Sequence, residues 1–77
     1  MTRRRLPALS ADAVVRALER EGFAVHRIKG SHHHLRNTDR PRARPVVPVH
    51  RGGLPPGTLR AIIRQAGLSV DEFLDLL

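Results

Sequence analysis

Histidines 32 to 34 are the residues of this chain best suited to chemistry, because imidazole can both accept and donate a proton near neutral pH. They belong to a segment, residues 31–37, whose composition predicts a β-strand. Side chains alternate between the two faces of a strand, so burial of Leu35 would turn His32, His34 and Arg36 to the opposite, exposed face. We therefore expect two imidazoles and one guanidinium in a single exposed row.

A tight turn is expected immediately before this strand. Glycine adopts the positive φ of such a turn without a clash at Cβ, so Lys29-Gly30 is predicted to close a β-hairpin. Gly30 and Ser31 are accordingly assigned structural roles in the turn. Ser31 is a poor candidate for a nucleophile, because no carboxylate lies close to it in the sequence.

Two kinds of chemistry suit the histidines. RNA supplies its own nucleophile, the 2′-hydroxyl, so a ribonuclease needs little more than a base, an acid and cations around the phosphate. Alternatively, His32 and His34 could chelate zinc or nickel. No cysteine and few acidic residues are nearby to complete a metal shell, so no metal and no cofactor is predicted.

Positive charge dominates most of the chain. All 14 Lys and Arg residues precede Leu68 and face only four acidic residues there, a net charge of +10, whereas the last three acidic residues give the tail −3. Thirteen of these 14 residues are Arg, whose forked guanidinium suits phosphate, although an arginine-rich solvated surface is an equally good explanation of charge alone. Phe23 and Phe73 are the only aromatic residues, so RNA would be held through phosphates, sugars and shape rather than by base stacking.

Composition also bounds the organisation of the chain. Its 77 residues suffice for one small domain, predicted at 10–77, and residues 1–9 are expected to form a flexible basic arm. The absence of cysteine favours a reducing compartment, and no apolar run approaches the length of a membrane span. We expect a cytoplasmic protein without a membrane anchor.

The order of predicted elements is α-β-β-β-α with a short additional helix. Ser10 is expected to cap a helix over 11–21, and Pro56 to begin a second helix that Gly67 closes. Ser69-Val70-Asp71-Glu72 has the pattern of a capping box that starts a short third helix. Strands are predicted at 23–28, 31–37 and 43–49, and Pro45 and Pro48 confine the last of them to a sheet edge.

These elements predict an α+β fold in which a three-stranded antiparallel sheet has two helices on one face. The sequence does not determine which face of the first strand is buried. A two-residue turn would place Ala24, His26 and Ile28 on the side of Leu35, whereas a longer turn would bury Phe23 and Val25 instead.

Several blocks, in this order and spacing over about residues 10–72, resemble the HicA toxin family of bacterial toxin–antitoxin modules. They are Gly22-Phe23, Lys29-Gly30-Ser31-His32-His33, Val47-Pro48-Val49-His50, Pro56-Gly57-Thr58-Leu59-Arg60 and Gln65-Ala66-Gly67-Leu68. The resemblance implies a fold like the double-stranded-RNA-binding domain. It also implies a type II toxin that cleaves mRNA and is masked by a HicB-like antitoxin. The arginine-rich amino end and the acidic, leucine-rich carboxyl end depart from shorter family members.

The resemblance implies that His32, which follows the Gly-Ser pair, is the catalytic residue of a ribonuclease. The scarcity of metal ligands near it predicts that this ribonuclease acts without a metal ion. His50 is a candidate for a second proton-transfer group, and His26 is expected to be structural or simply exposed. The candidate RNA-binding residues are Lys29, His34, Arg36, Arg42, Arg44, Arg60 and Arg64. The alternative function is a non-catalytic module that binds double-stranded RNA or DNA.

Overall fold

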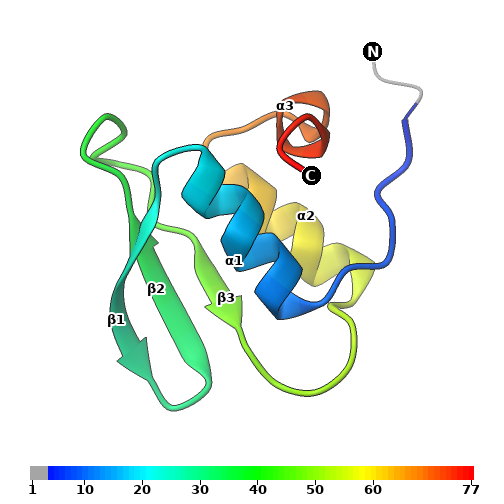
Figure 1. Ribbon diagram of the computed structural model, residues 1–77, viewed down its shortest axis with the longest axis horizontal. Helices are drawn as coiled ribbons and strands as arrows, with labels where there is room; N and C mark the ends of the chain where they lie inside the picture. The colour runs from blue at the N-terminus through cyan, green and yellow to red at the C-terminus, as the bar shows by residue number, and fades with distance from the viewer. Residues whose placement is uncertain (1–3) are drawn as a thin grey trace.

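The computed structural model describes residues 4–77 and shows the α+β architecture that the sequence predicts. A three-stranded antiparallel sheet, in the order β1-β2-β3, lies on one side and the two long helices pack together against it (Figure 1). The elements are α1 (Ala11–Arg20), β1 (Ala24–Lys29), β2 (His32–Arg36), β3 (Val46–Pro48), α2 (Pro56–Gln65) and α3 (Val70–Leu74). Each helix of residues 4–77 is too short and too polar to span a bilayer.

The core lies between the sheet and the helices. Ala11, Val14, Ala17 and Leu18 form the buried side of α1, at the spacing of an amphipathic helix. The Ser10 hydroxyl caps this helix as predicted, accepting a hydrogen bond from the Ala13 backbone N–H at 3.1 Å. These side chains meet Leu35 and Val47 of the sheet, together with Leu59, Ile62 and Ile63 of α2.

The hairpin turn is displaced by one residue from its predicted position. Lys29 pairs directly with His32, so the two turn residues are Gly30 and Ser31 rather than Lys29 and Gly30. Gly30 has φ +60, the left-handed conformation that the turn requires and that favours glycine. The second strand is therefore His32–Arg36 rather than 31–37, and the first extends to Lys29 rather than ending at Ile28.

A β-bulge in β1 resolves the question of its orientation in a way that neither simple register anticipates. The register shifts between Val25 and Arg27, so His26 is the extra residue of the bulge. Val25 pairs with Leu35, and Ile28 pairs with His33, so both apolar side chains lie on the helix-facing side. No helix of the described chain covers them fully, and Val25 and Ile28 remain exposed.

The third strand is an edge strand, as its prolines predict, but it is shorter than expected. Only Val46–Pro48 are in strand conformation, instead of 43–49. The Pro45 carbonyl still accepts a hydrogen bond from the Leu35 N–H, because proline loses only its donor. On its outer side, the Val46 N–H donates to Oε1 of Gln65 in α2 at 3.1 Å. This contact satisfies one edge donor and fastens α2 to the sheet.

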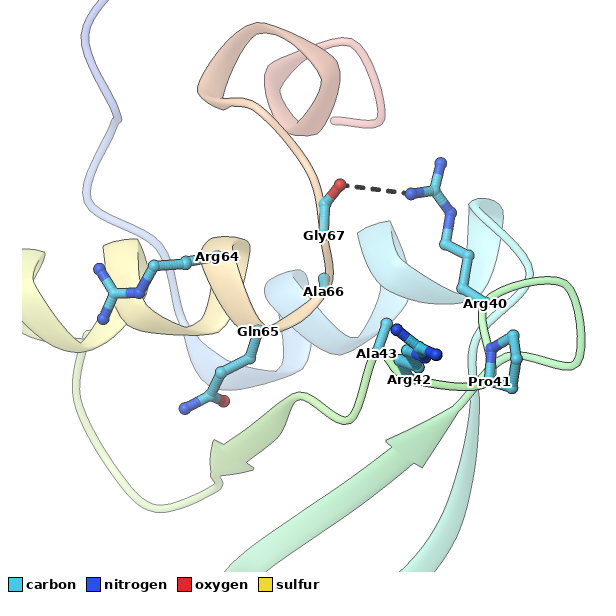
Figure 2. Close-up of a pocket in the computed structure, with 8 residues that line it drawn as sticks. All are labelled: Arg40, Pro41, Arg42, Ala43, Arg64, Gln65, Ala66 and Gly67. Atoms are coloured by element: carbon cyan, nitrogen blue, oxygen red, sulfur yellow. Dashed lines mark hydrogen bonds between the residues drawn. The ribbon is translucent and has the colours of Figure 1, made fainter.

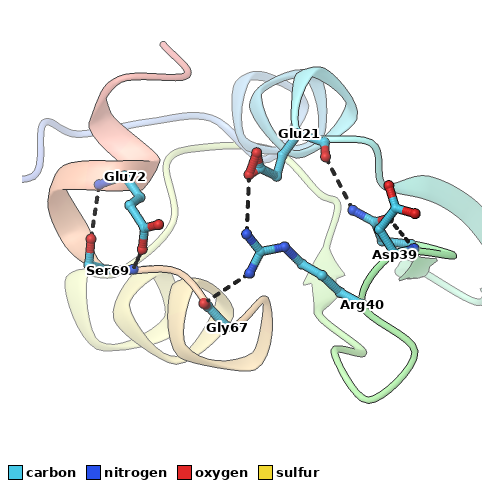
Figure 3. Close-up of polar contacts among 7 residues, drawn as sticks. Glu21, Asp39, Arg40, Gly67, Ser69 and Glu72 are labelled. Atoms are coloured by element: carbon cyan, nitrogen blue, oxygen red, sulfur yellow. Dashed lines mark hydrogen bonds and ion pairs between the residues drawn. The ribbon is translucent and has the colours of Figure 1, made fainter.

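The carboxyl end is part of the folded body. Ser69 and Glu72 form the predicted capping box, and the hydrogen bond from the Ser69 backbone N–H is the main reason that the pKa of Glu72 is lowered (Figure 3). The short helix that follows buries Phe73 and Leu74.

Residues 4–9, expected to belong to a flexible arm, also contact the body. Leu6 and Leu9 pack against the core, and the Leu9 carbonyl accepts from the Leu54 N–H at 2.9 Å. Arg4 Nη1 is 2.8 Å from the Asp75 carboxylate near the carboxyl end. Residues 1–3 of the predicted arm lie outside the described residues, and a domain boundary at residue 10 stays a prediction.

Hydrogen bonds and an ion pair hold the loop after β2 against both long helices. The buried Asn37 side chain donates to the Glu21 carbonyl at 3.2 Å and accepts from the Asp39 N–H at 2.9 Å. Arg40 reaches the Glu21 carboxylate at 3.6 Å and the Gly67 carbonyl at 3.3 Å (Figure 3). The end of α1, the loop and the end of α2 are thus fixed relative to one another.

We expect Asn37→Ala to lower the free energy of unfolding by about 1–3 kcal/mol, because it removes two part-buried hydrogen bonds between the side chain and the backbone. Urea denaturation followed by far-UV circular dichroism measures this change, since the chain has neither Trp nor Tyr for fluorescence. Thr38→Ala, at the exposed neighbouring position, is the matched control and should change stability little. Equal effects of the two substitutions would contradict the assigned role of Asn37.

Candidate active site on the open face of the sheet

The sheet face that the helices leave uncovered carries the histidine row. Leu35 is buried and His33 is half-buried on the helix-facing side, so the alternation predicted for this strand is confirmed. His32, His34 and Arg36 point to the other face, where His32 and Arg36 are exposed and His34 is half-buried. His33 Nδ1 is buried and has no hydrogen-bond partner in the described chain.

The strand register determines the neighbours of each histidine. His32 has Lys29 directly opposite it on β1 and Pro48 opposite it on β3. Side chains of directly opposed residues share one face and have Cβ atoms about 4.5–5.5 Å apart. Lys29 is therefore a cation directly across the strand pair from His32, and the one-residue shift of the turn creates this pair.

His50 lies near the same end of the sheet. The Val49 N–H donates to the Ser31 carbonyl at 2.6 Å, which brings the chain after β3 alongside the hairpin turn. His50 is the next residue and is exposed. It therefore follows the strand end at which Lys29 and His32 are paired.

Five of the seven candidate RNA-binding residues separate into two groups. His34, Arg36 and Arg44 line one cavity of about 180 Å³ at the sheet, and Arg36 and Arg44 also line a neighbouring cavity of about 250 Å³. Arg42 and Arg64 instead line an open depression of about 530 Å³ between the loop before β3 and the end of α2, and Arg64 extends along α2 away from Arg42 (Figure 2). Arg60 is exposed on α2, in the helical layer, and lines none of these cavities.

The strands provide a face without negative charge. None of the residues of β1, β2 and β3 is acidic, whereas Lys29, Arg27 and Arg36 are basic. The acidic residues occur on α1 and at its C-cap, on α3 and its flanks, and in the loop at Asp39. In residues 4–77, moreover, no three His, Asp or Glu side chains are grouped closely enough to hold a metal ion. The polar groups that the strands present on this face are imidazoles, guanidinium groups and the Lys29 ammonium group.

The site contains residues that sequence reasoning missed. His26 and Arg27 line the 180 Å³ cavity with His34, although His26 was expected to be structural or merely exposed. The bulge places both residues there, and regular alternation would have separated them. The sequence indicates this irregularity only in that it does not determine which face of residues 23–28 is buried.

The comparison with known families matches the region that contains these elements. Residues 11–68 match the family model described as HicA toxin of bacterial toxin-antitoxin. The chain belongs to the HicA toxin family. The matched region runs from the start of α1 to Leu68, just beyond α2, so α3 lies outside it. A search of the curated proteins found no match. Membership in the HicA family identifies the protein as a toxin of a toxin–antitoxin system, with an antitoxin as its partner.

Proposed function

We propose that this HicA-family protein is a ribonuclease that cleaves mRNA without a metal ion, and that His32 is its catalytic residue. The observation that supports this most is the pairing of an exposed imidazole with Lys29 on a sheet face that has no acidic residue. An imidazole that water can reach can exchange protons with a bound substrate. A neighbouring ammonium stabilises the negative charge that develops at the phosphate.

In the proposed reaction, the 2′-hydroxyl of RNA attacks the adjacent phosphorus. The O2′–P bond forms, the P–O5′ bond breaks, one proton leaves the 2′-hydroxyl and one proton is delivered to the departing 5′-oxygen. His32 performs one of these two transfers, and His50, near the same end of the sheet, is the candidate for the other. Lys29 lies beside the reactive phosphate, and Arg36, on the same face of β2, contacts the RNA backbone near it. The products are a 2′,3′-cyclic phosphate and a 5′-hydroxyl.

The proposed partner that restrains this activity is a HicB-like antitoxin with an acidic surface. The open face and its Arg residues attract an acidic protein for the same reason that they attract RNA. An antitoxin bound there would cover His32 and exclude the substrate. The rest of the basic set, Arg42, Arg60 and Arg64, is proposed to extend RNA or antitoxin contacts beyond the sheet.

We expect the purified protein to cleave mRNA equally well with and without EDTA, because none of the proposed steps uses a metal ion. A DNA strand of the same sequence should remain intact, because it lacks the 2′-hydroxyl. Gel analysis of the two strands, with end-group analysis of the RNA products, makes the measurement. Loss of RNA cleavage in EDTA, or cleavage of the DNA strand, would contradict the mechanism. RNA that is bound but never cut would favour the non-catalytic binding module.

A further inference from the structure

The cavity at the β1 bulge is lined by basic side chains that form no ion pair within residues 4–77. Five of its six lining residues are basic, namely His26, Arg27, His34, Arg36 and Arg44, and the sixth is Leu35. Among residues 4–77, none of these five side chains has an ion pair or a hydrogen bond. Three guanidinium groups around one cavity of about 180 Å³ repel one another, and an anion in the cavity would remove that repulsion.

The backbone builds this cavity from three segments. The bulge brings the consecutive residues His26 and Arg27 of β1 to the same cavity, and β2 adds His34 and Arg36. Arg44 precedes Pro45, whose carbonyl is hydrogen bonded to the Leu35 N–H, so it enters from the other side of β2. Guanidinium groups from three separate segments, together with two imidazoles, favour a phosphate group over a carboxylate because phosphate has more oxygens to accept their hydrogen bonds.

The cavity also lies at a fixed distance along β2 from the proposed catalytic residue. His34 follows His32 by two residues on the same face of β2, which corresponds to about 6.6 Å along the strand. That separation is similar to the distance between neighbouring phosphates in an extended RNA strand. A strand whose reactive phosphate lies at His32 and Lys29 would therefore present its next phosphate to the cavity.

We propose that the bulge cavity binds the RNA backbone phosphate next to the one that is cleaved, with Arg27 and Arg44 as its principal cationic contacts. This proposal rests on the proposed ribonuclease function and names a subsite of the same face. In this subsite, His26 and Arg27 both face the phosphate, because the bulge in β1 directs these two consecutive side chains toward it.

The test compares Arg27→Ala with Arg16→Ala, an exposed arginine on α1 that lines none of the described cavities. Both substitutions remove one positive charge, and each is made in the His32→Ala protein so that a short RNA oligonucleotide is bound without being cut. Affinity is measured over a series of salt concentrations. Arg27→Ala should weaken binding about 10- to 100-fold and reduce the salt slope by about 0.7, because one charged phosphate contact is lost. Arg16→Ala should change both quantities far less.

Two results would overturn the proposal. Arg27→Ala and Arg44→Ala variants that both behave like Arg16→Ala would show that no phosphate is held in the cavity. Chemical-shift changes at residues 27, 34 and 44 that appear with inorganic phosphate but not with the RNA oligonucleotide would identify a free-anion site. Failure of the proposed function is read separately, from RNA cleavage that persists in the His32→Ala protein while the effect of Arg27→Ala on binding remains.

Discussion

His32→Ala should reduce the rate of RNA cleavage by about 10²- to 10⁴-fold, which is the usual contribution of one general acid or base. The imidazole is exposed and lies at the end of β2, so its removal should leave the fold intact. RNA affinity should stay within a few-fold of the original value, because Lys29 and the Arg residues remain. Single-turnover cleavage and equilibrium binding of the same oligonucleotide measure the two quantities independently.

His34→Ala is the informative companion to this substitution. It removes an imidazole from the same face of the same strand, but from the bulge cavity rather than from beside Lys29. We expect it to weaken RNA binding more than it slows the cleavage step. A His32→Ala protein that is folded and cuts RNA at nearly the original rate would exclude His32 as the catalytic residue. Parallel losses of binding and cleavage would instead give His32 a binding role.

Phe73→Ala should produce the largest loss of stability, about 3–5 kcal/mol, because the ring is completely buried and its removal leaves a cavity. A domain of 77 residues has a total stability of roughly 4–12 kcal/mol, so this one substitution would remove a large part of it. Phe73 belongs to α3, which lies beyond the region matched to the HicA family. The expected effect thus makes the carboxyl tail an integral part of the core.

Leu77→Ala is the control for this experiment, since Leu77 is in the same tail but is 49% exposed. It should change the urea midpoint only slightly. If Phe73→Ala were equally mild, α3 would be only loosely attached to the body. Truncation after Leu68 should reproduce the loss seen with Phe73→Ala, because it removes the same buried ring together with Leu74.

Local sequence signals predicted the starts of α1 and α3 well because each cap lies within a few residues of the helix it starts. Ser10 caps α1, and the Ser69-Glu72 capping box starts α3, as expected. The orientation of His32 also followed from local sequence, because a single buried residue, Leu35, determines the side of every neighbour in its strand.

The features that sequence reasoning missed depend on contacts between distant segments. The bulge at His26 arises from pairing with β2, and β1 contains no glycine or proline that would indicate it. Asn37 was expected to be the last residue of the strand 31–37, but its side-chain amide donates a hydrogen bond to the Glu21 carbonyl sixteen residues away. From the sequence, the basic residues form one candidate RNA-binding set. In the fold, Arg42 and Arg64 lie apart from the sheet face.

The position of the carboxyl end has a practical consequence for studying the toxin on a surface. Arg20 Nη1 donates to the Leu76 carbonyl at 2.8 Å, and Arg4 binds Asp75, so the last residues are held among the helices (Figure 1). A biotin or fluorophore attached after Leu77 would therefore project from the helical layer. Immobilised through that label, the protein would present β1, β2 and β3 to RNA in solution, so kinetics recorded on a sensor chip should agree with those of the free protein.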